Sequence, residues 1–103
     1  MSLSKLFKPL INKFRTKYYI YSYKHTNGLV HTFWGPNRGG YTIDLNQAGI
    51  YYIEDCINDT DYYPLVHTKE SLQRYIKAGY DNFYIKEADI EKVLDKKMIC
   101  VLN

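Results

Sequence analysis

The side chains best suited to binding an anion lie around a glycine-rich loop. From Trp34 to Thr42 the chain reads WGPNRGGYT. Glycines let backbone N–H groups approach a phosphate closely, and an arginine can donate two parallel hydrogen bonds to it. We predict a ligand site in which Arg38 binds phosphate and an aromatic ring stacks on a base. The candidate ligand-binding residues are Trp34, Asn37, Arg38, Tyr41 and Thr42. A tight loop whose Trp34 and Tyr41 anchor the core is the alternative explanation.

Three histidines, each followed by threonine, raise the question of acid–base catalysis. We expect His25 in an exposed turn, His31 on a strand and His67 just before a helix. A two-histidine phosphodiesterase needs a hydroxyl residue two positions after each catalytic histidine. The residues at those positions are instead Asn27, Phe33 and Lys69. The loop also lacks the P-loop and dinucleotide-binding patterns. We therefore predict a protein that is not an enzyme, with no catalytic residue, metal site or cofactor, and keep a phosphodiesterase that degrades a nucleotide signal as an alternative.

A β-hairpin is the clearest structural prediction. The segments KYYIYSYK, from Lys17, and LVHTFW, ending at Trp34, are rich in strand-forming residues. Asn27-Gly28 between them is the pair that a two-residue type I′ turn prefers. Alternation places Tyr19, Tyr21 and Tyr23 on one face of the first strand, and Tyr18, Ile20 and Ser22 on the other. Packing of the tyrosine row under a helix explains it more simply than a stacking platform does.

Short elements follow the glycine loop. Asp44 is predicted to cap a short helix over residues 45–48, with Gln47 completing a variant of the capping box. Gly49 would end that helix in a left-handed conformation. Residues 50–53 have the composition of the next strand.

A capped helix is predicted in the second half of the chain. Thr68 stands before residues 69–78, and Gly79 is placed to end the helix. Its buried stripe consists of Leu72, Tyr75 and Ile76. Beyond it we predict a short strand over 83–85, a helix over 87–96, and a final strand or docked tail over 98–102.

These elements predict an α+β fold. Residues 17–103 would form a small single domain with an antiparallel sheet, built on the hairpin, and short helices packed on one face. Residues 1–16 have apolar positions at helical spacing that Pro9 interrupts. We predict an amphipathic arm or short helix there, which docks on the domain or on a second subunit.

Charge is divided unevenly along the chain. The first 43 residues hold 7 of the 14 basic side chains and none of the 11 acidic ones. This favours an anion-binding face, or two copies whose halves neutralise each other. Cys56 and Cys100 fit neither a disulfide framework nor a zinc site, so we expect buried thiols. Neither a membrane span nor a secretory signal is recognisable, which favours a cytoplasmic protein without a membrane partner.

The central stretch resembles a group of small proteins encoded by bacteriophages and prophages. Their pattern is a strand ending in Trp, a Pro-Asn loop, Gly-Tyr-Thr, Asp, and then Ala-Gly before an aromatic residue. The matching residues are Trp34, Pro36, Asn37, Gly40, Tyr41, Thr42, Asp44, Ala48, Gly49 and Tyr51. The resemblance implies a phage accessory protein acting in the host bacterial cytoplasm, where such proteins often counter host defence.

Together these observations predict a protein that acts by binding, as a homo-oligomer. The leading hypothesis is an anti-defence protein that sequesters a nucleotide second messenger of host immunity, either cyclic or of the ADP-ribose type. The first alternative is a protein–protein inhibitor of a host defence complex, because Tyr and Trp commonly anchor interfaces. A second alternative is a nucleic-acid-binding protein that uses Lys5, Lys8, Lys13 and Arg15.

Overall fold

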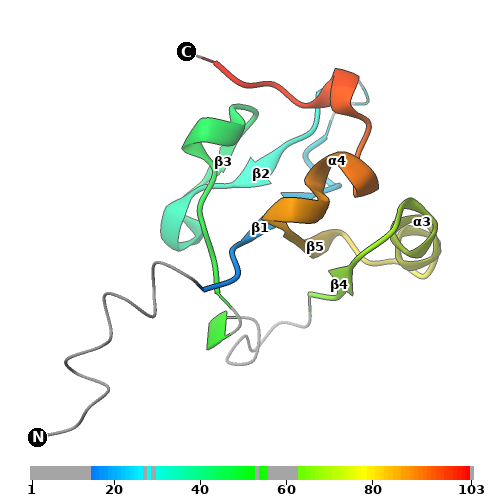
Figure 1. The fold of residues 1–103 in the computed structure, drawn as a ribbon. Coiled ribbons are helices and arrows are strands. Elements are labelled where there is room, and N and C mark those ends of the chain that lie inside the picture. The colour runs from blue at the N-terminus through cyan, green and yellow to red at the C-terminus, as the bar shows by residue number, and fades with distance from the viewer. Residues whose placement is uncertain (1–14, 27, 29, 53, 56–62, 103) are drawn as a thin grey trace, which may run out of the picture.

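A five-stranded sheet forms the centre of the computed structural model, which describes residues 15–26, 28, 30–52, 54–55 and 63–102. The strand order is β3-β2-β1-β5-β4 (Figure 1). The strands are β1 (Tyr18–Ser22), β2 (Phe33–Trp34), β3 (Tyr41–Thr42), β4 (Leu65–Val66) and β5 (Asn82–Lys86). The helices are η1 (Pro36–Arg38), η2 (Leu45–Gln47), α3 (Lys69–Lys77), η3 (Glu87–Asp89), α4 (Ile90–Val93) and η4 (Lys96–Met98). The predicted α+β class is confirmed, whereas most of the predicted N-terminal arm lies outside the described residues.

The sheet is mixed rather than wholly antiparallel. Neighbouring strands pair antiparallel from β3 to β5, but β4 pairs parallel to β5. Parallel neighbours need a crossover connection, and α3 supplies it between these two strands. β4 was missed in the sequence because it is only two residues long.

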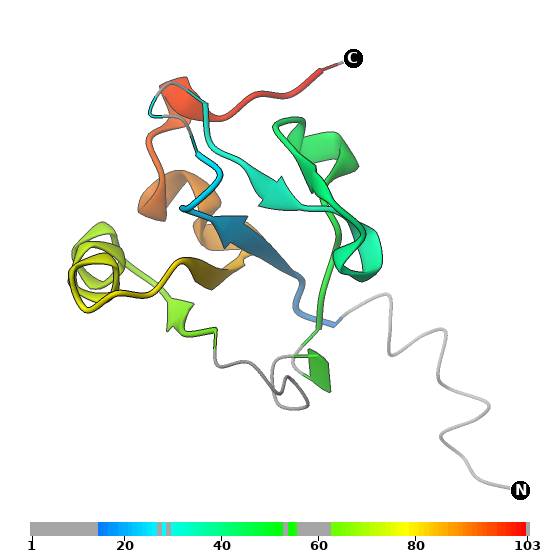
Figure 2. The ribbon, with the colours of Figure 1, turned by 180° about the vertical axis from the view of Figure 1, so that it is seen from behind.

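The predicted alternation along β1 is confirmed. Tyr19 and Tyr21 pack with Phe33, Phe83 and the apolar residues of α3 and α4. Tyr18 and Ile20 belong to a second cluster on the opposite face of the sheet. The helix α4 lies in front of the sheet in Figure 1 and behind it in Figure 2, so the described α-helices cover one face. The tyrosine row is therefore core packing, except for the exposed Tyr23.

The hairpin is confirmed, but its predicted two-residue turn is wrong. β1 ends at Ser22 and β2 begins at Phe33, so the connection is long. The hydroxyl of Thr26 donates to the Ser22 carbonyl at 2.8 Å and accepts from the Thr32 N–H at 3.0 Å. These side-chain bonds replace the ladder that a tight turn would require. Gly28 has a φ of +86°, and Asn27 lies outside the described residues.

The first predicted helix of the second half of the chain is confirmed, whereas the second is not continuous. Thr68 caps α3, its hydroxyl accepting from the Ser71 N–H at 3.0 Å, and Gly79 follows the helix with a φ of +101°. The predicted helix over 87–96 is instead divided among η3, α4 and η4. Leu94 breaks it, because this side chain is buried while its backbone is extended.

Gly49 has a different role from the predicted helix end. The residue that ends η2 is Ala48, and Gly49 has no positive φ. A Cβ atom at Gly49 would lie 2.6 Å from the carbonyl oxygen of Gly35. Glycine is therefore needed for close approach between two backbone segments. The strand predicted over 50–53 is also wrong as far as it is described, since Tyr51 makes a single bridge to Tyr18.

The C-terminal segment is docked through the predicted cap residue. Asp44 Oδ1 accepts from the N–H groups of Asn46 and Leu102, each at 3.0 Å. The first bond confirms Asp44 as the cap of η2. The second, with a bridge between Asp44 and Cys100, attaches the tail to the domain. Cys100 is half-buried rather than buried, and Cys56 lies outside the described residues.

Candidate functional site

Aromatic side chains cover the face of the sheet opposite α3 and α4. Tyr18, Tyr51 and Tyr84 form its buried cluster, with Trp34 and Tyr63 packed against them. The ring centroids of Tyr63 and Tyr84 are 5.9 Å apart, and those of Tyr51 and Tyr84 are 6.4 Å apart. Such tilted and edge-to-face pairs are favourable arrangements for aromatic rings. This face is thus a layer of packed aromatic rings.

Arg38 enters this layer from the glycine loop. Its Nη2 donates to the Tyr84 hydroxyl at 3.0 Å, and its guanidinium lies 5.5 Å from the centroid of the Tyr63 ring. Its backbone N–H donates to the Tyr51 hydroxyl at 2.9 Å, and that hydroxyl donates to the Gly35 carbonyl. Burial raises the pKa of Tyr51, and the bond from Arg38 partly offsets this. The neutral hydroxyl of Tyr51 therefore connects the start of the loop, at Gly35, to Arg38.

The loop reaches Arg38 through two left-handed residues. Asn37 and Arg38 have φ values of +54° and +55°, a region that side chains other than glycine rarely adopt. The strain is supported by the bonds that Arg38 makes to Tyr51 and Tyr84. A backbone held in this way presents the guanidinium in one direction.

A surface pocket of about 570 Å³ lies beside Arg38. Its lining includes Asn37, Arg38, Tyr51, Tyr52 and Asp55. The carboxylate of Asp55 accepts from the Tyr52 N–H through one oxygen, at 2.6 Å. The pocket therefore combines a guanidinium, phenol rings and a carboxylate, which can bind a phosphate, a planar ring and an N–H donor respectively.

A second arginine lies next to the pocket. The guanidinium of Arg15 is 4.1 Å from the centroid of the Tyr52 ring and forms an ion pair with Glu54. This contact fixes the ring of Tyr52 and places positive charge on its π face. Arg15 comes from the end of the basic N-terminal segment, so the acid-free part of the chain does reach this site.

The structure divides the predicted site residues into two groups. Asn37 and Arg38 line the pocket, whereas Trp34, Tyr41 and Thr42 do not. The ring of Trp34 packs against that of Tyr41 in a tilted arrangement with centroids 4.3 Å apart, and its Nε1 donates to the side chain of Asn82. The Thr42 hydroxyl accepts from the N–H of the following cap residue, Asp44. In the structure these three residues make packing and turn contacts, and Tyr41 remains 43% exposed rather than anchoring the core.

Backbone N–H groups of the glycine loop were predicted to approach a phosphate, but those whose partners are known donate to other groups of the protein. The N–H of Gly35 donates to the Gly40 carbonyl at 2.7 Å, and that of Gly39 donates to the Pro36 carbonyl at 2.9 Å. The N–H of Arg38 is held by Tyr51. The glycines thus close the loop on itself, and a ligand would be held by side chains.

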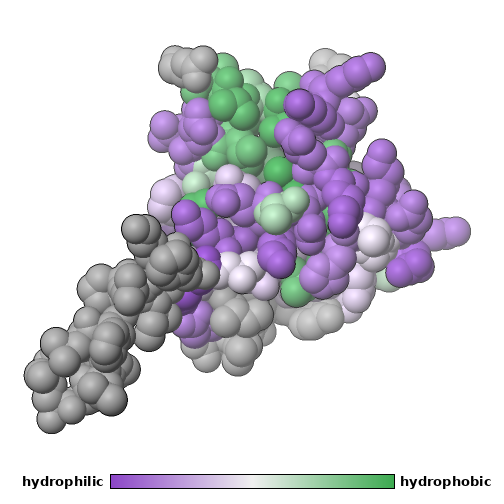
Figure 3. All heavy atoms as spheres, in the orientation of Figure 1, coloured by the Kyte–Doolittle hydropathy of each residue, from purple (hydrophilic) through white to green (hydrophobic). Residues whose placement is uncertain are grey.

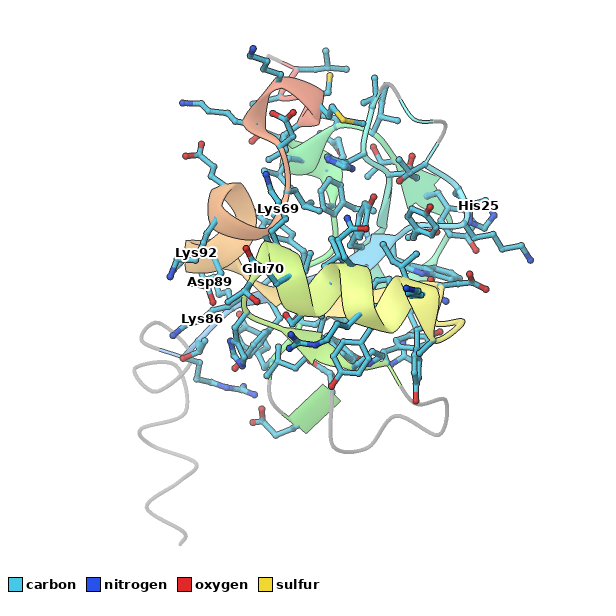
Figure 4. The ribbon with its side chains drawn as sticks, turned by 90° about the vertical axis from the view of Figure 1, so that its right-hand side faces the viewer. His25, Lys69, Glu70, Lys86, Asp89 and Lys92 are labelled. Carbon is cyan, nitrogen blue, oxygen red and sulfur yellow. The ribbon has the colours of Figure 1, made fainter. Side chains whose placement is uncertain are left out.

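The histidines do not converge. His25 lies 2.8 Å from the Ser22 hydroxyl through Nδ1, and its ring stacks on Tyr41. His67 pairs with Asp89 at 3.6 Å, and Figure 4 shows His25 and Asp89 on opposite sides of the molecule. His31 is buried just before β2 rather than on a strand. The three histidines therefore have different hydrogen-bond and ion-pair partners.

Sequence reasoning missed the tyrosines that make the pocket. Tyr51 and Tyr52 line the pocket, whereas Tyr63 and Tyr84 hold the guanidinium of Arg38 beside it. Tyr51 matches the motif of the phage-protein resemblance, but the motif did not indicate that it lies at the site, and the other three belong to no recognisable motif. The one available signal was the abundance of tyrosine, at 12 of 103 residues, which does not say which of them meet Arg38.

Comparison with protein-family models, curated proteins and solved structures gives no match. Among the residues that the structure describes, no three His, Cys, Asp or Glu side chains gather in a way that could hold a metal ion. The helices within that part of the chain are all too short or too polar to cross a bilayer.

Proposed function

We propose that this protein is a phage accessory protein that acts by binding and sequesters a nucleotide second messenger of host immunity in the Arg38 pocket. One observation carries the proposal: the guanidinium of Arg38 is oriented by Tyr84 and Tyr63 beside a pocket that tyrosines line. An arginine held in place loses less conformational entropy when it binds phosphate than a free one does.

Each part of a nucleotide has a partner in this arrangement. Arg38 binds a phosphate, Tyr52 offers a ring to the base, and the second oxygen of Asp55 accepts from an amino group of the base or a ribose hydroxyl. A cyclic oligonucleotide or an ADP-ribose-type nucleotide carries all three groups. Because the contact between Arg38 and a phosphate is electrostatic, binding should weaken as the salt concentration rises.

Isothermal titration calorimetry against cyclic di- and trinucleotides and ADP-ribose tests the proposal. We expect saturable binding of at least one member, weakened at least tenfold in Arg38→Ala. Arg38→Lys should also bind more weakly, because lysine cannot form the paired hydrogen bonds. Arg74→Ala, which removes an exposed arginine of α3, is the matched control. Absence of heat with every nucleotide, or an equal loss of affinity in Arg38→Ala and Arg74→Ala, would refute the proposal.

The fate of the ligand separates sequestration from catalysis. After the complex is denatured, chromatography should recover the nucleotide unchanged. Recovery of a cleaved product would instead support the phosphodiesterase alternative.

A second candidate function is supported by an apolar surface on another part of the molecule. β3 is an edge strand, and exposed side chains of Tyr41 and Ile43 lie in and after it. Val101 and Leu102 of the docked tail are 53% and 55% exposed. Figure 3 shows apolar side chains gathered above β3 and this tail. Such a patch beside an open strand edge is typical of protein–protein contact.

This surface supports the alternative in which the protein inhibits a host defence complex. Pull-down from a bacterial host lysate followed by reconstitution with the purified partner tests it. We expect Ile43→Lys to abolish the reconstituted complex and Arg38→Ala to leave it intact. Retention of the complex by Ile43→Lys would exclude this surface.

A further inference from the structure

A second cavity, of about 550 Å³, lies on the helix side of the sheet. It is bounded by α3, by the segment around α4 and η4, and by the hairpin connection. Its apolar part includes Leu72, Ile76 and Leu94. Figure 4 faces α3, with Lys69 at its first turn, and Lys69 also lines the cavity. The cavity is on the other side of the sheet from the Arg38 pocket and shares no lining residue with it.

His31 gives this cavity an unusual polar group. The residue is only 8% exposed, and its Nδ1 lies 2.9 Å from the Tyr21 hydroxyl. Its Nε2 is buried and has no hydrogen-bond partner among the described residues. Buried polar atoms nearly always have partners, because leaving one without a hydrogen bond is costly. A ligand group that reached Nε2 from the cavity, after a side chain covering this atom moved, would form the missing hydrogen bond.

The neighbouring tyrosine indicates which kind of group. Burial raises the pKa of Tyr21 and lowers that of His31, so both side chains are neutral near pH 7. We assign the hydrogen of this bond to the Tyr21 hydroxyl, which then donates to Nδ1. A neutral imidazole that accepts at Nδ1 carries its hydrogen on Nε2. The ligand group that forms the missing hydrogen bond with Nε2 is therefore an acceptor.

The charges around the cavity indicate that this acceptor is uncharged. Lys24 and Lys69 line it, and so do Asp81 and Asp95, so the formal charges balance. Asp95 also acts electrostatically on His31, and an anion placed at Nε2 would be repelled by this carboxylate. A carbonyl oxygen avoids that repulsion. Met98, which is flexible and also lines the cavity, can move to admit it.

We infer that this cavity binds a small, uncharged molecule whose carbonyl oxygen accepts a hydrogen bond from His31 Nε2 and whose apolar body packs on Leu72, Ile76 and Leu94. The inference does not depend on nucleotide binding at Arg38. It adds a second ligand class on the helix side of the protein.

A matched pair of probes tests the inference by NMR titration. Acetophenone and ethylbenzene have nearly the same shape, but only acetophenone has a carbonyl. We expect acetophenone to shift the backbone amides of Leu72, Ile76 and Leu94, and to bind roughly two- to tenfold more tightly than ethylbenzene, as expected for one hydrogen bond. The ring nitrogens of His31 should show the Nε2–H form before and after binding.

Two variants test whether His31 causes the preference for acetophenone. In His31→Phe the preference for acetophenone should disappear, whereas His25→Phe, outside the cavity, should retain it. If His31→Phe does not fold, the wild-type affinity ratio and the His31 nitrogen signals still decide. Equal affinity for the two probes, absence of shifts at the three lining amides, or a hydrogen on Nδ1 would each overturn the inference.

Discussion

Replacement of Gly49 by alanine should destabilise the protein through one specific collision. The new Cβ atom would lie 2.6 Å from the Gly35 carbonyl oxygen and 2.8 Å from both the Gly35 carbonyl carbon and Cε2 of Tyr51. Two of these atoms belong to the backbone at the start of the Arg38 loop, so no side-chain rotation relieves the contact. The 3.0 Å bond from the Gly49 N–H to the Trp34 carbonyl would also be strained.

The size of the effect follows from these contacts. Overpacking of a closely packed site costs about 1–3 kcal/mol, and a lost hydrogen bond costs a further 0.5–1.5 kcal/mol or so. Alanine also lowers the entropy of the unfolded chain, which returns about 0.4–1 kcal/mol. The free energy of unfolding should therefore fall by about 2–3 kcal/mol in Gly49→Ala.

Urea unfolding followed by circular dichroism measures this difference. Gly39→Ala is the matched control, because its Cβ would lie 3.1 Å from the Pro36 oxygen and its φ is −92°. We expect the control to change the free energy of unfolding by less than about 1 kcal/mol. Equal stability of Gly49→Ala and the control would refute the close-approach explanation for Gly49.

Three further perturbations follow from single contacts. Because burial lowers the pKa of His31 below its ordinary 6.5, the unfolded chain is protonated first as pH falls. The free energy of unfolding should therefore decrease as pH falls through 6.5, by at most about 1.4 kcal/mol per pH unit, and His31→Phe should flatten this slope in urea titrations. Asp44→Ala removes the acceptor of the Asn46 and Leu102 N–H groups. It should lower the free energy of unfolding by about 2–3 kcal/mol and accelerate hydrogen exchange at the Leu102 amide. Unchanged exchange at Leu102 would contradict the role of Asp44 in docking the C-terminal segment. Thr68→Ala should cost about 1 kcal/mol in the same unfolding assay, whereas Thr68→Ser should cost little.

Local patterns predicted the fold where one residue type determines the conformation. Thr68 and Gly79 bound α3 as predicted, because a hydroxyl cap and a left-handed glycine act within a few residues. Alternation along β1 was predicted because successive side chains of any strand point to opposite faces of the sheet. Where distant contacts decide, prediction failed: Leu94 leaves the predicted helix to enter the core, and Gly49 is fixed by its contact with Gly35.

The candidate site followed the same rule. Asn37 and Arg38 were found because they stand together in a glycine loop, and they line one pocket. Trp34 and Tyr41, their neighbours in the sequence, do not line that pocket, because they are cross-strand partners in β2 and β3 and pack against each other. Tyr84 could not be found, because its place beside Arg38 depends on the pairing of β5 with β1.

The proposed function requires that Arg38 binds a nucleotide. The direct measurement is an NMR titration that follows the side-chain Nε–Hε signals of the arginines while cyclic oligonucleotides and ADP-ribose are added. We expect the Arg38 signal to shift and saturate with one of these ligands, together with shifts of the Tyr51 and Tyr52 signals. The signal from Arg74 should not change. An unshifted Arg38 signal at saturating concentrations of every nucleotide would contradict the proposed function.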